Sequence, residues 1–212
     1  MIKHIVFDYG NVLIRFKPEE ELRKYTNSDE ETAQLKNMIY LSKPWKDGDR
    51  GLLNREESIR ALCETYPQKT KLLRTVMCAC SDWLTMPENI PPFLDKLRMA
   101  GYSLYYISNT NPKDYETIMQ KYSALRSIPG IASFKEHILK PEPAIFSIFL
   151  DRFSLQAGAC LFIDDMADNT AVAAAFGFQT LTLTTGADTL PETLIQHEEI
   201  GRRLTEKGLI QF

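Results

Sequence analysis

The sequence predicts an α/β fold: a doubly wound parallel sheet with an all-helical domain inserted into it. Two observations support this prediction. From about residue 87 onward, short apolar runs alternate with helical patterns, which is the order of elements in a parallel sheet with right-handed crossovers. Before that point, one helix signal follows another without a strand pattern between them. We therefore expect residues 1–15 and 87–212 to form the sheet domain, and residues 16–86 to form the helical domain.

The composition is that of an ordinary globular protein. Among the 212 residues, 44% are hydrophobic and 25% are charged, and the net charge of −3 gives no indication of binding to nucleic acid or to an anionic membrane. No apolar run reaches the roughly 20 residues that span a bilayer, and the first residues lack the pattern of a signal peptide. The four cysteines fit no disulfide framework, so we expect a cytoplasmic protein.

The first strand is expected at residues 3–7, where Ile and Val stand beside an aromatic residue, the composition of a strand covered on both faces. It stops at Asp8, and Gly10 and Asn11 supply the turn chemistry for a sharp exit from the sheet. Ligands of open parallel sheets lie just beyond the carboxyl ends of the strands, so Asp8 stands where chemistry usually occurs. The alternative is an Asp that only caps the next segment.

Helix starts identify the helical domain. Pro18 followed by three glutamates is typical of a first helical turn. Ser28 opens a second helix with a capping-box pattern, and Asn54 opens another. A further helix is expected at residues 71–84. Residues 45–51 contain two glycines, a tryptophan and mixed charge, so we expect a loop there.

The second half alternates between the two kinds of element. The expected strands are residues 102–107, 160–163 and 179–183. The expected helices are residues 90–100, 112–122, 142–153 and 169–176, and residues 188–207 are expected to form one charged helix.

Polar residues follow the core strands. The sets are Asp8 after the first strand, Ser108-Asn109-Thr110-Asn111 after the second and Asp164-Asp165 after the third, and Lys140 precedes a helix that a proline opens. Carboxylates brought together repel one another, and several acids with room for water suit Mg²⁺. A lysine and a hydroxyl aimed at the same point would orient a phosphate. A carboxylate nucleophile could then form an aspartyl-phosphate that water hydrolyses.

These four stretches, in this order and with this spacing, resemble the four motifs of the haloacid dehalogenase superfamily, from residue 2 to about residue 183. The resemblance implies a Rossmann-like core domain and an inserted helical cap that excludes water and selects the substrate. It also implies a Mg²⁺-dependent phosphatase that acts on a small phosphorylated metabolite.

The resemblance assigns roles around the phosphate. Asp8 is similar to the family's nucleophile, whose carboxylate also touches the metal ion. Ser108 resembles the hydroxyl that binds the phosphoryl group, with Asn109 supplying further donors. Lys140 resembles the lysine that steadies both nucleophile and phosphate.

The resemblance also implies a metal site. Gly10 corresponds to the residue whose backbone carbonyl binds the ion. Asp164 and Asp165 match the acidic pair of the fourth motif, with Asp165 as the first choice for direct ligation, and Asp168 or Asn169 would support that pair.

One residue departs from the common family pattern. Most family phosphatases carry an Asp two places after the nucleophile as general acid and base, and this chain has Gly10 there. The pattern Asp-x-Gly-Asn-Val resembles a branch that includes bacterial sugar-1-phosphate phosphatases. A good leaving group, a cap residue or a metal-bound water could replace the missing acid, and the sequence does not choose among them.

The loop at residues 45–51 has two interpretations. Arg50 or Lys46 could bind a carboxylate or a distal phosphate of the substrate, and Trp45 could stack on a sugar. The alternative is a solvated turn whose tryptophan is anchored in the core of the cap.

The leading functional hypothesis is a phosphatase for a small phosphomonoester, such as a sugar phosphate. A 2-haloacid dehalogenase is the second hypothesis, although carbon–halogen displacement needs no Mg²⁺ and the acid cluster would repel a carboxylate substrate. A catalytically silent protein that binds a phosphorylated ligand or a protein partner is the third. The substrate and the oligomeric state do not follow from the sequence.

Overall fold

A parallel sheet forms the centre of the molecule. The computed structural model describes residues 1–211, and in these the sheet has five strands in the order β3-β2-β1-β4-β5. The strands are β1 (His4–Phe7), β2 (Ser103–Ser108), β3 (Gly130–Ala132), β4 (Cys160–Asp164) and β5 (Gln179–Thr182). Every neighbouring pair is parallel, and β1 lies between β2 and β4. The predicted α/β class with a parallel sheet is therefore confirmed.

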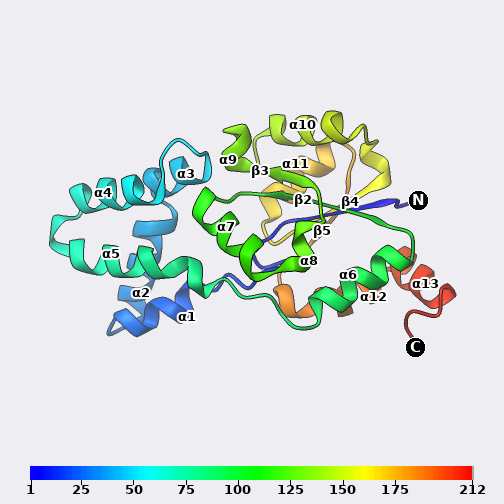
Figure 1. Cartoon of the computed structure of the whole chain (residues 1–212), viewed down its shortest axis with the longest axis horizontal. Helices are drawn as coiled ribbons and strands as arrows, with labels where there is room; N and C mark the ends of the chain where they lie inside the picture. The colour runs from blue at the N-terminus through cyan, green and yellow to red at the C-terminus, as the bar shows by residue number, and fades with distance from the viewer. Residues whose placement is uncertain (212) are drawn as a thin grey trace.

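Helices cover both faces of this sheet (Figure 1). On one face the core packs against α6 (Ile90–Met99), α7 (Pro112–Lys121), α8 (Ser123–Arg126), α12 (Leu190–Gln196) and α13 (Glu198–Glu206). The other face packs against α10 (Pro143–Phe153) and α11 (Ala167–Ala175), and the short α9 (Ser133–Glu136) follows β3. Alternation along β1 explains the two layers, because Ile5 and Phe7 enter the first cluster and Val6 enters the second.

The regular secondary structure of the predicted cap, residues 16–86, consists of helices. It contains α1 (Pro18–Leu22), α2 (Asp29–Tyr40), α3 (Lys43–Asp49), α4 (Arg55–Thr65) and α5 (Thr70–Ala79), with short 3₁₀ turns at Arg23–Tyr25, Pro67–Lys69 and Cys80–Trp83. Ser28 and Asn54 cap α2 and α4, as the sequence predicts. The cap has a hydrophobic cluster of its own around Leu35, Ile59 and Leu73.

Two connecting segments, one containing Arg15 and the other Thr85, join the cap to the core. The amide of Arg15 donates a hydrogen bond to the carbonyl oxygen of Thr85 at 2.7 Å, in an isolated antiparallel bridge. In Figure 1 the cap helices α1 to α5 lie at one end of the molecule, away from the two termini. We therefore propose that residues 16–86 form a separate domain, in line with the boundaries expected from the sequence.

Three elements differ from the expectations. Residues 45–51 were expected as a loop, but Ser42 caps α3 and Pro44 stands in its first turn, so most of the segment is helical. The expected single helix at residues 188–207 is wrong, because His197 is extended and separates α12 from α13. The short β3 was missed, since three residues carry too little pattern to be recognised. A Cβ at Gly130 would lie 2.1 Å from the carbonyl oxygen of Tyr106, so β3 requires glycine there.

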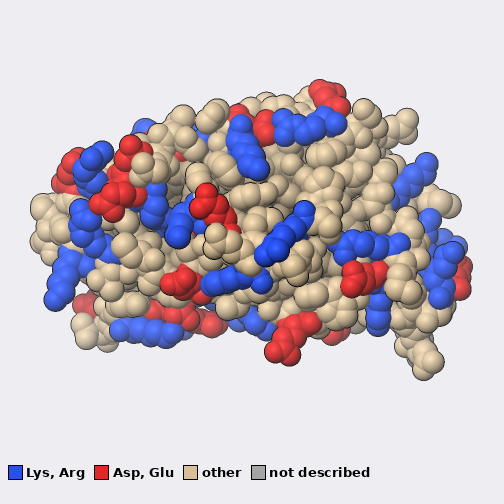
Figure 2. Space-filling model, viewed as in Figure 1, with Lys and Arg blue, Asp and Glu red and all other residues tan. Residues whose placement is uncertain are grey.

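The surface carries charges of both signs. Figure 2 shows lysine, arginine and acidic side chains interspersed on the visible face, without a continuous basic area there. Among the described residues 1–211, the helices are too short and too polar for any of them to cross a membrane.

Candidate active site

Three carboxylates meet at the carboxyl ends of the central strands. Asp8 directly follows β1, and Asp164 and Asp165 stand at the end of β4, which pairs with β1 in register. One oxygen of each carboxylate lies within 4.8 Å of the others. From β1 the strand order runs to β2 and β3 on one side and to β4 and β5 on the other, so the gap between β1 and β4 is the switch point at which open α/β sheets bind ligands.

A buried lysine joins two of these acids. The Nζ of Lys140 lies 2.9 Å from Oδ1 of Asp8 and 2.6 Å from Oδ2 of Asp164, and its side chain is 1% exposed. Burial alone would lower the pKa of Lys140, but Asp164 and Asp8 outweigh that effect and hold the pKa above its usual value. The ammonium group therefore stays charged between the two carboxylates.

The two acids of β4 differ in how many partners they have. Asp164 is fully buried, and its carboxylate accepts hydrogen bonds from Lys140, the Met166 amide and Asn169. Asp165 accepts one side-chain hydrogen bond, from Asn11 at 2.9 Å, and lines the cavity described below. Asp165 thus has more free lone pairs facing the cavity than Asp164.

Asn11 is a site residue that the sequence analysis treated only as a turn former. It has a left-handed φ of 53°, a conformation that Asn tolerates better than most residues. Its Oδ1 accepts a hydrogen bond from the Phe16 amide at 3.0 Å while its Nδ2 donates to Asp165. The amide thereby fixes the turn after β1 to the acid after β4. The signal in the sequence was the Asn itself, directly after a turn glycine.

The carboxylates carry more negative charge than Lys140 neutralises. Burial raises the pKa of Asp8 to about 7; Lys140 opposes this shift, and Asp164 and Asp165 add to it. Burial also raises the pKa of Asp165, against the hydrogen bond from Asn11. Crowded acids of this kind, lining a cavity with room for water, fit the oxygen ligands that Mg²⁺ prefers.

The second motif provides the hydroxyl of Ser108 and, through Asn109, two hydrogen bonds to the backbone of Lys140. Ser108 is the last residue of β2, is 1% exposed and lines the cavity. Asn109 uses its side chain for a different purpose, since it donates to the carbonyl of Lys140 at 2.9 Å and accepts from the Lys140 amide at 2.8 Å. This pair of hydrogen bonds fixes the backbone that carries the lysine, so the Asn109 side chain positions Lys140.

The position two residues after Asp8 is open. Gly10 lines the cavity, and a Cβ built there would meet no other heavy atom within 4 Å. Its φ is outside the left-handed region, so a side chain at position 10 would be tolerated.

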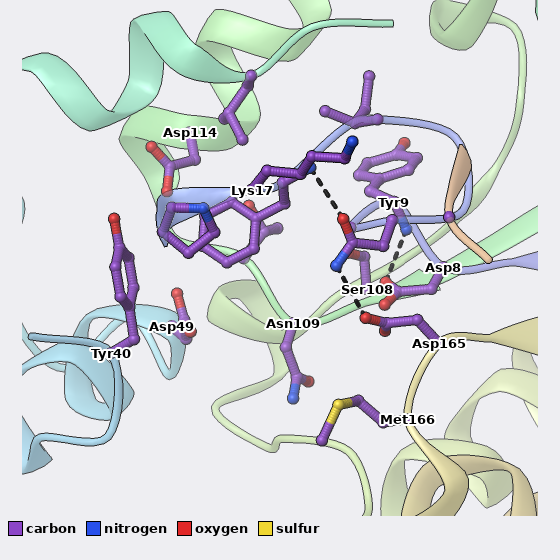
Figure 3. Close-up of a pocket in the computed structure, with 18 of the residues that line it drawn as sticks. Asp8, Tyr9, Lys17, Tyr40, Asp49, Ser108, Asn109, Asp114, Asp165 and Met166 are labelled. Atoms are coloured by element: carbon purple, nitrogen blue, oxygen red, sulfur yellow. Dashed lines mark hydrogen bonds between the residues drawn. The ribbon is translucent and has the colours of Figure 1, made fainter. Parts of the chain in front are cut away.

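A cavity of about 1010 Å³ opens over Asp8 and Asp165, and Asp164 is buried behind them. Its lining combines residues after the core strands with residues of the cap, including Trp45 and the two residues labelled in Figure 3, Tyr40 and Asp49. This volume is at the upper end for small-molecule sites. The elements of the cap and the core therefore enclose one shared binding space.

The protein-family comparison matches residues 2–177 to a haloacid dehalogenase-like hydrolase. The chain belongs to this family. The matched range contains all four motifs and the cap, so the resemblance inferred from the motifs and the Rossmann-like fold with a helical cap are confirmed.

This haloacid dehalogenase-like hydrolase is similar in sequence to two phosphatases and to part of a third protein. It is 22% identical over 193 residues to the sesquiterpene phosphatase astK of Aspergillus oryzae, covering 90% of this chain and 94% of that one. It is 24% identical over 202 residues to a D-ribitol-5-phosphate phosphatase of Bacteroides thetaiotaomicron, with 89% and 95% covered. It also matches acyl-CoA dehydrogenase family member 10 of Mus musculus, 38% identical over 69 residues, but spans only 6% of that protein.

One similar solved structure is a HAD-family enzyme from Bacteroides thetaiotaomicron in complex with magnesium and inorganic phosphate. The TM-score is 0.68 at 23% identity, with 86% of this chain and 94% of that chain covered. At this identity the similarity establishes the shared fold.

The cap residues proposed from the sequence lie in different places. Trp45 lines the cavity and packs edge-on against Tyr40, with ring centroids 4.6 Å apart. Arg50 points elsewhere: its guanidinium pairs with Glu142 and donates to the His137 carbonyl, outside the cavity lining. Lys46 is exposed and is also outside that lining. Of these three, only Trp45 faces the binding space.

A buried polar network connects the cap to the second motif. Arg55 of α4 donates to Asp114 at 2.7 Å and to Asn111 at 3.1 Å, and the side chains of the ion pair are 15% and 12% exposed. Asn111 also donates to Asp49 of α3 at 3.3 Å. The sequence placed Asn111 in the second motif and Arg55 at a helix start, but it did not indicate that they pair, because they are distant in the chain.

Among the expected supporting residues, Asn169 donates to Asp164 at 2.9 Å. Asp168 is exposed and stands outside the cavity lining. The structure thus brings together Asp8, Gly10, Ser108, Lys140 and Asp165, with Asp164 and Asn169 directly behind them.

Proposed function

We propose that this protein is a Mg²⁺-dependent hydrolase that removes phosphate from a small phosphomonoester through an aspartyl-phosphate at Asp8. The supporting observation is the position of Lys140, 2.9 Å from Asp8, beside two further acids and under a cavity of about 1010 Å³. A nucleophilic carboxylate, a fixed cation and a free hydroxyl are the parts that phosphoryl transfer to Asp requires.

Each residue has a defined task in this proposal. The Asp8 carboxylate attacks phosphorus, and Lys140 orients that carboxylate and neutralises charge on the phosphoryl oxygens. The Ser108 hydroxyl, which lines the cavity, donates a hydrogen bond to a phosphoryl oxygen. Asn109 keeps Lys140 in place through the two hydrogen bonds to its backbone.

The metal would be held by Asp8, Asp165 and the carbonyl oxygen of Gly10, with Asp164 as a supporting acid that already accepts three hydrogen bonds. A bound Mg²⁺ supplies charge neutralisation for the phosphate and lowers the pKa of the neighbouring carboxylates. Asp8 has to be ionised to attack phosphorus. Because burial raises its pKa to about 7 in the metal-free protein, a cation bound beside it would favour the ionised carboxylate.

The substrate is proposed to be a small phosphorylated metabolite of the cytoplasm, rather than a nucleic acid or a membrane lipid. The four cysteines are unpaired, as in a reducing compartment. Phosphates of a polyol and of a terpenoid alcohol are natural candidates, because the two phosphatases similar to this chain are named for such compounds. The aromatic side chains of Tyr40 and Trp45 could pack against either kind of organic group.

The test is a panel of phosphate esters that spans sugar, polyol, terpenoid and aryl phosphates, assayed with Mg²⁺ and with chelator. We expect Mg²⁺-dependent phosphate release that Asp8→Asn abolishes. The Lys113→Met variant, which changes an exposed charge, is the matched control and should retain wild-type rates.

Two other functions give different results in the same assay. A haloacid dehalogenase would release chloride from 2-chloropropionate in the presence of chelator. A silent ligand-binding protein would release no phosphate from any ester, yet calorimetry would detect binding of phosphate esters. Either result would contradict the phosphatase proposal.

A further inference from the structure

Gly10 leaves this site without a proton donor at the usual position. When Asp8 attacks phosphorus, the bond to the organic oxygen opens on the opposite side, because the attacking and leaving oxygens lie in line. An alkoxide is a poor leaving group unless an acid protonates it as the bond breaks. The structure shows empty space at Gly10, so position 10 itself supplies no proton, and a residue of the cap is one of the possible donors.

The leaving group points toward the cap. Asp8 lines the cavity at the end of β1, and residues of the cap such as Tyr40 and Asp49 line the same cavity. Figure 3 shows Asp8, Ser108 and Asp165 on one side of the cavity, Asn109 in the middle, and Asp49 on the opposite side. A proton donor for the departing alcohol is therefore expected among the titratable side chains of the far side.

Most acids that line the cavity are occupied. Asp165 lies beside Asp8, on the wrong side for the leaving group. Glu19 pairs with Lys36, which lowers the pKa of Glu19 and keeps it ionised. Glu20 is exposed and lies 3.4 Å from Lys17. Asp114 accepts hydrogen bonds from three side chains: Arg55, Ser81 and Asn111.

The tyrosines of the cavity do not fit the task either. Tyr9 and Tyr40 both line it, and their hydroxyls have no hydrogen-bond partner among the described residues. Burial raises the pKa of both hydroxyls further above their ordinary value, so they are weak proton donors near neutral pH.

Asp49 is the remaining acid of the lining, and its hydrogen-bond partners are Asn111 and Trp45. It is the last residue of α3 and is partly buried, and Asn111 donates a long hydrogen bond of 3.3 Å to its Oδ1. Burial raises the pKa of Asp49 to about 7, and Asp114 of α7 adds to the shift, while Asn111, Arg55 of α4 and Trp45 oppose it. A carboxyl with this pKa is both a competent acid and, once ionised, a competent base.

We propose that Asp49 of the cap is the general acid and base that replaces the residue missing at Gly10. This inference rests on the proposed phosphatase function. As the bond from phosphorus to the organic oxygen breaks, Asp49 gives its proton to that oxygen, and an alcohol leaves. The Asp49 carboxylate then takes a proton from the water that attacks the aspartyl-phosphate, which releases phosphate and restores both Asp8 and Asp49.

The test uses three esters of similar shape: 4-nitrophenyl, phenyl and benzyl phosphate, whose leaving alcohols are progressively more basic. The quantity measured is kcat/KM, because it reports only the steps up to formation of the aspartyl-phosphate. For Asp49→Asn we expect a loss of about 100-fold or more on benzyl phosphate and a much smaller loss on 4-nitrophenyl phosphate. Asp47→Asn, on the same helix and paired with Lys43, is the matched control and should lose equally little on all three esters.

A rescue experiment separates proton donation from a structural role. Introducing Gly10→Asp into Asp49→Asn places a carboxyl in the open space near the leaving group, and we expect the rate on benzyl phosphate to recover at least tenfold. Asp49→Ser, which keeps a hydrogen-bond acceptor for Asn111, is the second variant if Asp49→Asn does not fold, and it should show the same selective loss.

A uniform loss on all three esters would overturn the proposal, since it would mean that Asp49 only maintains the shape of the cap. Unchanged hydrolysis of benzyl phosphate by either Asp49 variant would overturn it as well. Failure of the phosphatase function itself looks different: the wild-type protein would hydrolyse none of the three esters with Mg²⁺ present.

Discussion

The ammonium group of Lys140 lies 2.9 Å from the carboxylate of Asp8, and the lysine side chain is 1% exposed. A charge buried to this degree is stable only beside opposite charges, and Asp164 supplies the second one at 2.6 Å. The contact therefore links the stability of the core directly to the proposed catalytic group.

Replacing this lysine should weaken the fold as well as the reaction. Lys140→Met keeps the length of the side chain but leaves two buried carboxylates without their cation. We expect a loss of about 3–5 kcal/mol in the free energy of unfolding and about a 100-fold or greater loss of phosphatase activity. Urea unfolding in chelator measures the first effect, and a loss below 1 kcal/mol would contradict the structure.

Metal binding should stabilise the folded protein through Asp165. At a Mg²⁺ concentration 100-fold above Kd, the free energy of unfolding should rise by about 2.7 kcal/mol. The rise should be smaller at pH 5 than at pH 7.5, because burial raises the pKa of Asp8 and Asp165 and protons then compete with the metal. Asp165→Asn should remove most of the effect, whereas Asp168→Asn, which changes an exposed neighbouring acid, should preserve it. Equal Mg²⁺ stabilisation of both variants would rule out Asp165 as a ligand.

The ion pair between Arg55 and Asp114 should hold the cap against the core. Arg55→Met removes the cation from a pair that is 15% and 12% exposed, and we expect a loss of about 3–5 kcal/mol in the free energy of unfolding. The same change at Arg60, an exposed residue of the same helix, should cost less than about 0.5 kcal/mol. Similar unfolding curves for the two variants would show that the pair contributes little.

The stability of the protein should depend on pH through Asp49. Its pKa is raised from the ordinary value of 3.8 to about 7, so the folded state holds this proton more tightly than the unfolded chain does. The corresponding stability is complete below pH 3.8 and is lost as the pH rises to about 7. Asp49→Asn lacks this loss, so its stability relative to the wild type should increase between pH 4.5 and pH 7.5. Urea midpoints of both proteins in chelator measure the difference, and a constant offset across this range would contradict the shift.

The local sequence predicted much of the fold because its signals are local. A few neighbouring residues are enough to recognise the helix N-caps at Ser28 and Asn54. The same is true of the apolar strands β1, β2 and β4. The strand β3 was not predicted, because the requirement for Gly130 comes from its close approach to Tyr106, a residue of the adjacent strand. The break at His197 was missed for a related reason. The chain turns there so that both α12 and α13 pack against the core, and that packing involves residues distant in the sequence.

The same contrast holds for the site. Four motifs in order predicted that Asp8, Ser108, Lys140 and Asp165 would lie together, and the structure places them around one cavity; their roles in a reaction stay a prediction. The roles of Arg50 and Trp45 could not be separated in the sequence, since helix orientation decides which of them faces the cavity.

The sequence by itself determined the parallel sheet, the helical insertion and the set of acids at the strand ends, because strand periodicity, helix caps and turn residues act over a few positions. Only the tertiary structure decided that Asn11 holds Asp165, that Asn109 holds Lys140 and that Asp49 faces Asp8 across the cavity. Burial, and with it the pKa of a carboxyl, depends on which distant segments pack around that carboxyl, and no short stretch of sequence contains this information.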